Sequence, residues 1–169
     1  PRLPAVPRAI LETMSHQNFP DMRYGPDPNF HIYLAFGQSN MDGNASPSDD
    51  DKDVPDGYLK MCTDDGHDGE TVGEWYPAVP PLARVGAGLG VADYFGRKML
   101  EYKQESNPNA RVGIICVAVP GCATDMFDKD KYVEYRDSAA DWLQNIANNQ
   151  YGGNPYGRMV ECAKKAMEQ

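Results

Sequence analysis

Positive charge is scarce in this sequence. Lys and Arg total 16 against 25 Asp and Glu, which gives a formal net charge of −9 at pH 7 and a pI near 4.7. The basic residues form no stripe along the chain. Nucleic-acid backbones and anionic membrane surfaces bind patches of Lys and Arg. We therefore expect neither nucleic acid nor a membrane surface as a partner.

Long apolar runs and cysteines are also few. The longest apolar run, residues 112–123, contains glycine and proline and is much shorter than the roughly 20 residues of a membrane span, so no span is predicted. Four cysteines without a CxxC spacing are too few for a disulfide scaffold. Cys116 lies in the apolar run and Cys162 in a helical pattern, so we expect both to be small buried hydrophobic residues.

What remains is an ordinary globular composition. The 169 residues, 41% apolar and 24% charged, are enough for one domain with a real core.

The first 29 residues hold six prolines and predict an arm lying on the domain, with one helical turn near residues 10–14. The chain begins at Pro1 without an initiator Met or a signal-peptide pattern, which favours a leader removed earlier or a chain cut at that point.

Two strands are predicted. Residues 30–36 alternate, with Phe30, Ile32, Leu34 and Phe36 on one face. Residues 112–119 are apolar nearly throughout, which is typical of a strand buried on both faces.

Three helices and one long loop complete the predicted elements. Helices are expected at residues 91–102, 137–147 and 156–167. Residues 44–72 are rich in Asp and predict a long polar loop, and loops of this length are usually functional or disordered. Strands alternating with helices predict an α/β fold with right-handed parallel crossovers. Because two strands make a poor parallel sheet, we expect the chain to be the first part of a larger α/β domain.

The segment directly after the first strand carries the chemistry. It reads Gly37-Gln38-Ser39-Asn40-Met41-Asp42-Gly43-Asn44. Ligands of open α/β sheets bind outside the carboxyl ends of the strands. A serine on a tight turn there presents its hydroxyl beside backbone N–H groups that can meet an oxyanion. The alternative is that Ser39 or Asn40 only caps a short helix.

Six blocks resemble the sialate O-acetylesterase and acetylxylan esterase group. This group is carbohydrate esterase family 6, within the SGNH-hydrolase superfamily. The resemblance covers about residues 28–169 and implies a three-layer parallel-sheet, flavodoxin-like fold that is incomplete at its carboxyl end, with residues 30–169 as the first portion of the esterase domain. The blocks are HIYLAFGQSNMDGN (31–44), GEWYPAVPPL (73–82), ADYFGR (92–97), VGIICVAVPGC (112–122), MFDKD (126–130) and YGGNPY (151–156).

The resemblance also implies roles for individual residues. Ser39 would be the nucleophile, and the N–H groups of Ser39 and Gly121 would form the oxyanion hole. Gln38 and Asn40 are expected substrate contacts. Apart from the resemblance, Trp75 and Tyr76 are aromatic residues able to stack on a sugar ring, although aromatic residues in loops more often pack against the protein. The family often has Gly-Gly where this chain has Pro-Gly121, and because proline has no N–H, only Gly121 can donate there.

The family's later Gly-Glu-Ser-Asn and Asp-x-x-His blocks are not in their expected places. The resemblance therefore implies a His base beyond Gln169, with the rest of the esterase domain as partner. Asp64 and His67 also spell Asp-x-x-His, but in the wrong chain order, which favours a solvated loop; His31 is expected to be structural, and His16 lies in the arm. Two acidic clusters, residues 64–70 and 125–130, lack calcium-hand spacing and predict a solvated surface rather than a metal site.

The expected function is removal of acetyl groups from a polysaccharide such as acetylated xylan through an acyl-enzyme on Ser39, without cofactor or metal. The resemblance implies a secreted or periplasmic protein. A sialate O-acetylesterase is the alternative enzyme, and a catalytically dead carbohydrate-binding or scaffold module is the alternative from another class. The glycines of residues 86–90 are misplaced for a dinucleotide loop and predict a tight loop that leads into the helix.

Overall fold

Four strands form one sheet in the order β1-β4-β2-β3. The computed structural model describes residues 27–168. β1 and β2 each pair in parallel with β4, and β3 pairs antiparallel with β2. The strands are β1 (Phe30–Gly37), β2 (Tyr58–Met61), β3 (Trp75–Pro77) and β4 (Arg111–Ala118).

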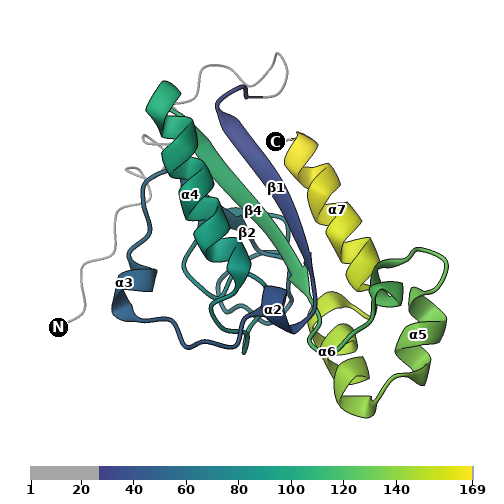
Figure 1. Cartoon of the computed structure of the whole chain (residues 1–169). Coiled ribbons are helices and arrows are strands. Elements are labelled where there is room, and N and C mark those ends of the chain that lie inside the picture. Colours follow the sequence, from purple (N-terminus) through teal and green to yellow (C-terminus); the bar gives the residue numbers. More distant parts are fainter. Residues whose placement is uncertain (1–26, 169) are drawn as a thin grey trace.

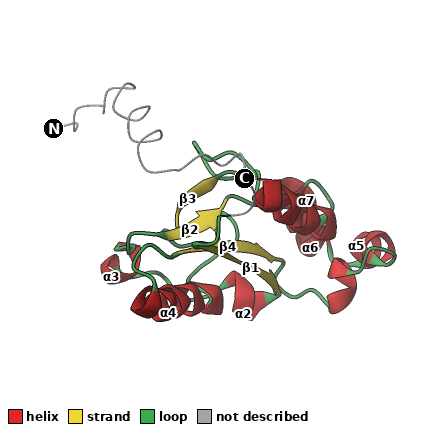
Figure 2. Ribbon diagram, turned by 90° about the horizontal axis from the view of Figure 1, so that it is seen from above, coloured by secondary structure: helices red, strands yellow, loops and turns green. Residues whose placement is uncertain are grey.

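Helices cover both faces of this sheet. α4 packs on one face, and α6 and α7 lie on the other side, which gives the three layers that are expected (Figures 1 and 2). The helices are α2 (Ser39–Asp42), α3 (Asp49–Lys52), α4 (Val91–Ser106), the 3-10 turn η2 (Thr124–Phe127), α5 (Tyr132–Ser138), α6 (Asp141–Tyr151) and α7 (Pro155–Glu168). Within residues 27–168, no helix is long and apolar enough to cross a membrane.

β4 is the buried centre of the sheet, as its sequence predicts. Ile114 and Cys116 face the core under α4, whereas Ile115 and Val117 face the helices on the opposite side. All four side chains are at most 1% exposed. Burial of an aliphatic side chain of this size stabilises a fold by about 1.5–3 kcal/mol, so β4 holds the two faces together.

β1 keeps the predicted alternation of faces. It pairs in register with β4 from Phe30 opposite Arg111 to Gly37 opposite Ala118. Tyr33 and Ala35 pack against the α4 core. The opposite face carries Ile32, Leu34 and Phe36, which are 36–48% exposed. In the described part of the chain, β1 pairs with β4 alone, so its outer edge is open.

The polar segment 44–72 contains more regular structure than predicted. It is not one long loop, because it includes the short helix α3 and the strand β2. With β3, the sheet has four described strands instead of the predicted two. Lys60 interrupts the apolar pattern of β2, yet it is buried, donates to the Pro81 carbonyl and pairs with Glu70 at 3.3 Å. Long-range pairing with β4, rather than local pattern, creates this strand.

The helices also differ from their predicted bounds. α4 continues to Ser106, and the helix expected at residues 137–147 is two helices, α5 and α6. The predicted arm and its helical turn at residues 10–14 lie outside the described residues, except for residues 27–29. His16 lies outside them as well. Cys116 and Cys162 are buried free thiols, as expected.

Candidate active site

Ser39 lies at the carboxyl end of β1. The strand ends at Gly37, and Ser39 is the first residue of α2. The cap of this helix is Gln38, so the interpretation of Ser39 or Asn40 as a helix cap is wrong. Ser39 is half-buried between the exposed residues Gln38 and Asn40. Ser39 therefore lies at the carboxyl ends of the parallel strands, where open α/β sheets bind ligands.

Two hydrogen bonds join Ser39 to the side chain of Gln38. The Oε1 atom of Gln38 accepts from the backbone N–H of Ser39 at 2.8 Å and from its hydroxyl at 2.6 Å. The two donors of Ser39 thus converge on a single carbonyl oxygen. During acyl transfer, the carbonyl oxygen of an ester accepts a hydrogen bond from the backbone N–H of the nucleophile, which is the position that the Gln38 oxygen occupies at Ser39.

The turn after β4 lies next to the end of β1. The N–H of Val119 donates to the carbonyl of Gly37 at 3.0 Å, and the Cys122 thiol lies 3.9 Å from the same oxygen. Gly121, inside this turn, is exposed and has φ +72°, which favours glycine. The Gly37 carbonyl therefore links the end of β1, which precedes Ser39, to the turn that contains Gly121.

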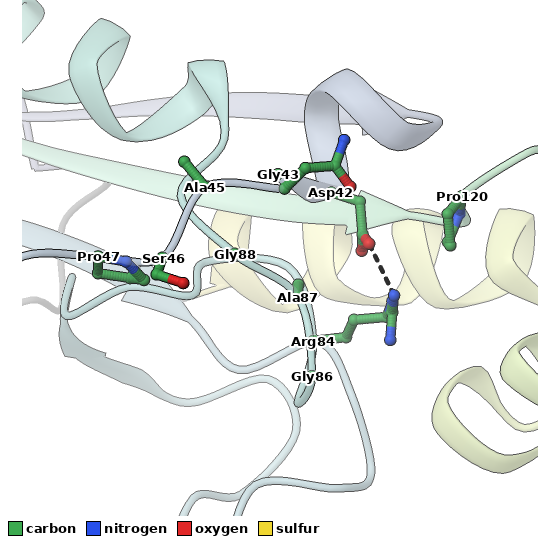
Figure 3. A pocket seen from close by; sticks show the side chains of 11 residues that line it. Asp42, Gly43, Ala45, Ser46, Pro47, Arg84, Gly86, Ala87, Gly88 and Pro120 are labelled. Carbon is green, nitrogen blue, oxygen red and sulfur yellow. Dashed lines mark hydrogen bonds and ion pairs between the residues drawn. The ribbon is translucent and has the colours of Figure 1, made fainter.

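A pocket of about 430 Å³ opens between α2, the loop before α4 and the turn after β4 (Figure 3). Its charged lining residues are Asp42 and Arg84. The full lining consists of Asp42, Gly43, Asn44, Ala45, Ser46, Pro47, Arg84, Gly86, Ala87, Gly88 and Pro120.

Asp42 and Arg84 form a buried ion pair at one side of this pocket. Arg84 Nη2 lies 2.7 Å from Asp42 Oδ2. Both residues are less than 10% exposed, and among residues 27–168 Asp42 Oδ1 and Arg84 Nε have no hydrogen-bond partner. Burial raises the pKa of the Asp42 carboxyl, and the hydrogen bond from Arg84 opposes this rise. The pair brings no net charge to the pocket while Asp42 is ionised.

Residues 29–169 match the model of a protein family described as carbohydrate esterase, sialic acid-specific acetylesterase. The chain belongs to this family. The expected relationship to the sialate O-acetylesterase group is confirmed, and the α/β sheet with helices on both faces agrees with an SGNH-type esterase. Family membership identifies a hydrolase that acts on carboxylic esters of carbohydrates.

The glycines of residues 86–90 serve packing in this esterase. Gly88 N–H donates to the Gly43 carbonyl at 2.9 Å, and Leu89 N–H donates to the Ala45 carbonyl at 2.7 Å. A Cβ on Gly43 would lie 2.5 Å from the Gly90 backbone nitrogen. Gly90 then caps α4. The prediction of a tight loop leading into the helix is confirmed, and the loop forms one wall of the pocket.

The Asp64-x-x-His67 segment forms a local cluster. His67 Nε2 lies 3.7 Å from Asp64 Oδ2, and its Nδ1 lies 3.8 Å from Glu70 Oε2. Asp64 is buried and accepts backbone N–H groups of Gly66 and Val85. Within the described residues, the hydroxyl of Ser39 bonds to Gln38 and to no histidine. Within residues 27–168, no three or more Asp, Glu, His or Cys side chains lie together in a way that could hold a metal ion.

Trp75 is not brought to Ser39. Its ring contacts Phe30, the first residue of β1, with centroids 4.9 Å apart, whereas Ser39 lies two residues beyond the other end of the strand. A different tryptophan lies near the site. A Cβ on Gly121 would come within 2.6 Å of Cη2 of Trp142. Sequence reasoning missed both Trp142 and Arg84, because neither residue stands in a catalytic motif.

Proposed function

We propose that this esterase removes acetyl groups from a neutral polysaccharide such as acetylated xylan, with Ser39 as the nucleophile. The observation that carries the proposal is the convergence of the Ser39 N–H and O–H groups at the carboxyl end of β1. The neighbouring turn supplies Gly121, whose N–H is the second expected oxyanion donor. Preorganised donors of this kind are among the largest contributions to catalysis of acyl transfer.

The reaction proceeds by acyl transfer in two halves. Ser39 Oγ leaves the Gln38 oxygen, gives its proton to a general base and attacks the acetyl carbonyl carbon. The carbonyl oxygen becomes an oxyanion held by the N–H groups of Ser39 and Gly121. The bond to the sugar oxygen breaks, and that oxygen takes the proton from the base. Water then attacks the acetyl-Ser39 ester, which releases acetate and regenerates the hydroxyl.

The general base in this proposal is a histidine outside the described residues, oriented by an Asp and supplied with the remaining part of the esterase domain. Two observations support this assignment. Ser39 has no histidine partner within residues 27–168, and the outer edge of β1, which pairs with no other described strand, is able to pair with a further strand. Gln38 cannot take this role, because its amide oxygen does not accept a proton at neutral pH.

The charges of the pocket support a neutral sugar over sialic acid. Sialic acid carries a carboxylate, and recognition of a carboxylate favours an unpaired Arg or Lys. The cation of this pocket, Arg84, already pairs with Asp42 at 2.7 Å. The chain as a whole has a formal net charge of −9, which repels an anionic substrate. Sialate O-acetyl esters are the second candidate, and the family's description favours them.

The test compares three substrates with the full-length protein: an aryl acetate, acetylated xylo-oligosaccharides and O-acetylated sialic acid. We expect acetate release from the first two, loss of at least about 10³-fold in kcat for Ser39→Ala, and no change for the control Ser106→Ala. Unchanged turnover in folded Ser39→Ala protein rules out the nucleophile. Faster turnover of the sialate ester selects the second candidate. Saturable sugar binding without acetate release selects a carbohydrate-binding module.

A further inference from the structure

Trp142 has an unusual environment for a large aromatic residue. It is the second residue of α6 and is 53% exposed. The inner face of α6 is formed by Leu143, Ala147 and Tyr151, which are buried in the core under α6 and α7. Trp142 does not belong to that core. Burial of an aromatic side chain is strongly favourable. A ligand that covers the half-exposed indole of Trp142, beside the turn that carries Gly121, would therefore gain binding free energy.

The exposed indole contacts Gly121 directly. A Cβ built on Gly121 would lie 2.6, 3.2 and 3.7 Å from the ring atoms Cη2, Cζ2 and Cζ3 of Trp142. The six-membered ring therefore rests on the Cα of the residue whose N–H is the proposed oxyanion donor. The exposed ring and the proposed oxyanion donor are therefore in direct contact.

The pocket reaches the same turn. Pro120 lines the pocket, and the next residue, Gly121, touches Trp142. The pocket and the indole thus contact consecutive residues of one segment. A substrate bound at Gly121 is within reach of both surfaces.

We propose that Trp142 is the platform on which the pyranose ring that carries the acetyl group lies. This inference rests on the proposed function. A pyranose presents a face of C–H groups, and the negative face of an aromatic ring attracts such weakly positive hydrogens. The platform takes an uncharged sugar, in keeping with the ion-paired Arg84 of the neighbouring pocket. Trp142 therefore sets affinity for the sugar portion of the substrate and does not act on the ester carbonyl.

Two tryptophans in the whole sequence make a direct binding experiment feasible. The other one, Trp75, packs against Phe30 and Gly113 at the far end of β1. Full-length Ser39→Ala protein prevents turnover of the ligand. In this protein, Trp142 is identified by difference: the Trp142 signal is the fluorescence response that a Trp75→Phe version keeps and a Trp142→Phe version loses. We expect acetylated xylo-oligosaccharide to change this signal saturably.

Kinetics separate a sugar platform from a structural role. With active Ser39, we expect Trp142→Ala to raise KM for acetylated xylo-oligosaccharide by about 3- to 10-fold, because an aromatic contact has roughly that worth. Ethyl acetate has no sugar ring, so we expect Trp142→Ala to lower its kcat/KM by a smaller factor than that of acetylated xylo-oligosaccharide. Trp142→Phe keeps a smaller aromatic face and is expected to restore part of the affinity.

Different outcomes overturn different statements. If Trp142→Ala lowers kcat equally for both esters, Trp142 only holds the Gly121 turn, and the platform is wrong. If the Trp142 signal does not respond to saturating xylo-oligosaccharide while the full-length enzyme hydrolyses it, the platform is again wrong and the esterase assignment stands. If Ser39→Ala retains activity but the Trp142 signal responds, the nucleophile is wrong and the sugar site stands. Circular dichroism confirms that each variant is folded.

Discussion

The hydroxyl and the N–H of Ser39 both donate to the side-chain oxygen of Gln38, at 2.6 and 2.8 Å. Gln38 thus places a neutral carbonyl oxygen where the proposed reaction develops negative charge. In the proposed reaction, an ester carbonyl displaces this oxygen from the Ser39 N–H. The contact makes Gln38 a positioning residue for the nucleophile, in addition to its expected contact with substrate.

Replacing Gln38 by Glu tests this relationship. The variant keeps the shape but puts a carboxylate beside the oxyanion, and two unit charges about 4 Å apart interact by about 4 kcal/mol near a protein surface. We expect kcat/KM for an aryl acetate to fall by at least about 100-fold at neutral pH. Because a protonated Glu regains a neutral carbonyl, the ratio of variant to wild-type kcat/KM is expected to rise as the pH falls toward about 4.3.

Gln38→Ala is the matched control for the charge. It removes the acceptor without adding a carboxylate, and the loss of ordinary hydrogen bonds predicts a decrease of only about 3- to 10-fold. Equal losses for the two variants at every pH would show that the charge at this position does not face the reacting ester.

Gly121→Ala is expected to damage both stability and catalysis. The residue has φ +72°, and a Cβ there would lie 2.6 Å from Trp142. We expect a loss of about 1–3 kcal/mol in the free energy of unfolding. Because this turn carries the proposed oxyanion donor, we expect kcat to fall by about 10²–10³-fold.

Gly152→Ala provides the comparison for Gly121. Gly152 also has a positive φ of 59°, but a Cβ there meets only Arg158 Nη2, at 3.7 Å. Urea denaturation is expected to show a destabilisation from backbone strain, with an unchanged kcat. If Gly121→Ala also leaves kcat unchanged, Gly121 is not an oxyanion donor.

Removing one partner of the buried ion pair is expected to destabilise the fold in a pH-dependent way. Burial already raises the pKa of Asp42 from its ordinary value of 3.8 against the opposing effect of Arg84. Arg84→Met removes this opposition, so the pKa of Asp42 rises further. A carboxyl whose folded-state pKa is raised stabilises the fold below its unfolded pKa, and that stabilisation is lost as the pH rises through the folded pKa.

We therefore expect Arg84→Met to cost about 3–5 kcal/mol at about pH 8 and clearly less at about pH 5. Urea denaturation at the two pH values measures this difference. In the double variant Asp42→Asn, Arg84→Met, neither charge of this pair remains, and we expect the loss to be the same at the two pH values. A single variant whose loss is the same at both pH values contradicts the buried carboxylate.

His67→Gln is expected to leave acetate release within about twofold of wild type. His67 lies 3.7 Å from Asp64 and 3.8 Å from Glu70, and within the described residues Ser39 bonds to Gln38 instead. The measurement is kcat for an aryl acetate with the full-length protein. General-base help is worth about 10²–10⁴-fold, so a loss of that size would identify His67 as the base and overturn the proposal of a histidine outside residues 27–168.

Local patterns in the sequence were sufficient to predict several elements. The alternation of residues 30–36 and the apolar run of residues 112–119 predict β1 and β4, because strand periodicity and burial are local properties of the chain. The position of Ser39 just beyond the carboxyl end of β1 could be predicted for the same reason, whereas its role as nucleophile stays a prediction. The helix that begins at Val91 was also predicted from its apolar stripe.

Tertiary structure alone decided the rest. β2 includes the buried cation Lys60, and its pairing with β4 and β3 makes it a strand, while Glu70 pairs with the buried charge. No local sequence pattern shows which tryptophan lies near Ser39, yet Trp75 packs against Phe30 and Trp142 packs against Gly121. These contacts join segments far apart in the chain, and their free energy comes from burial and charge pairing that exist only after the sheet has formed.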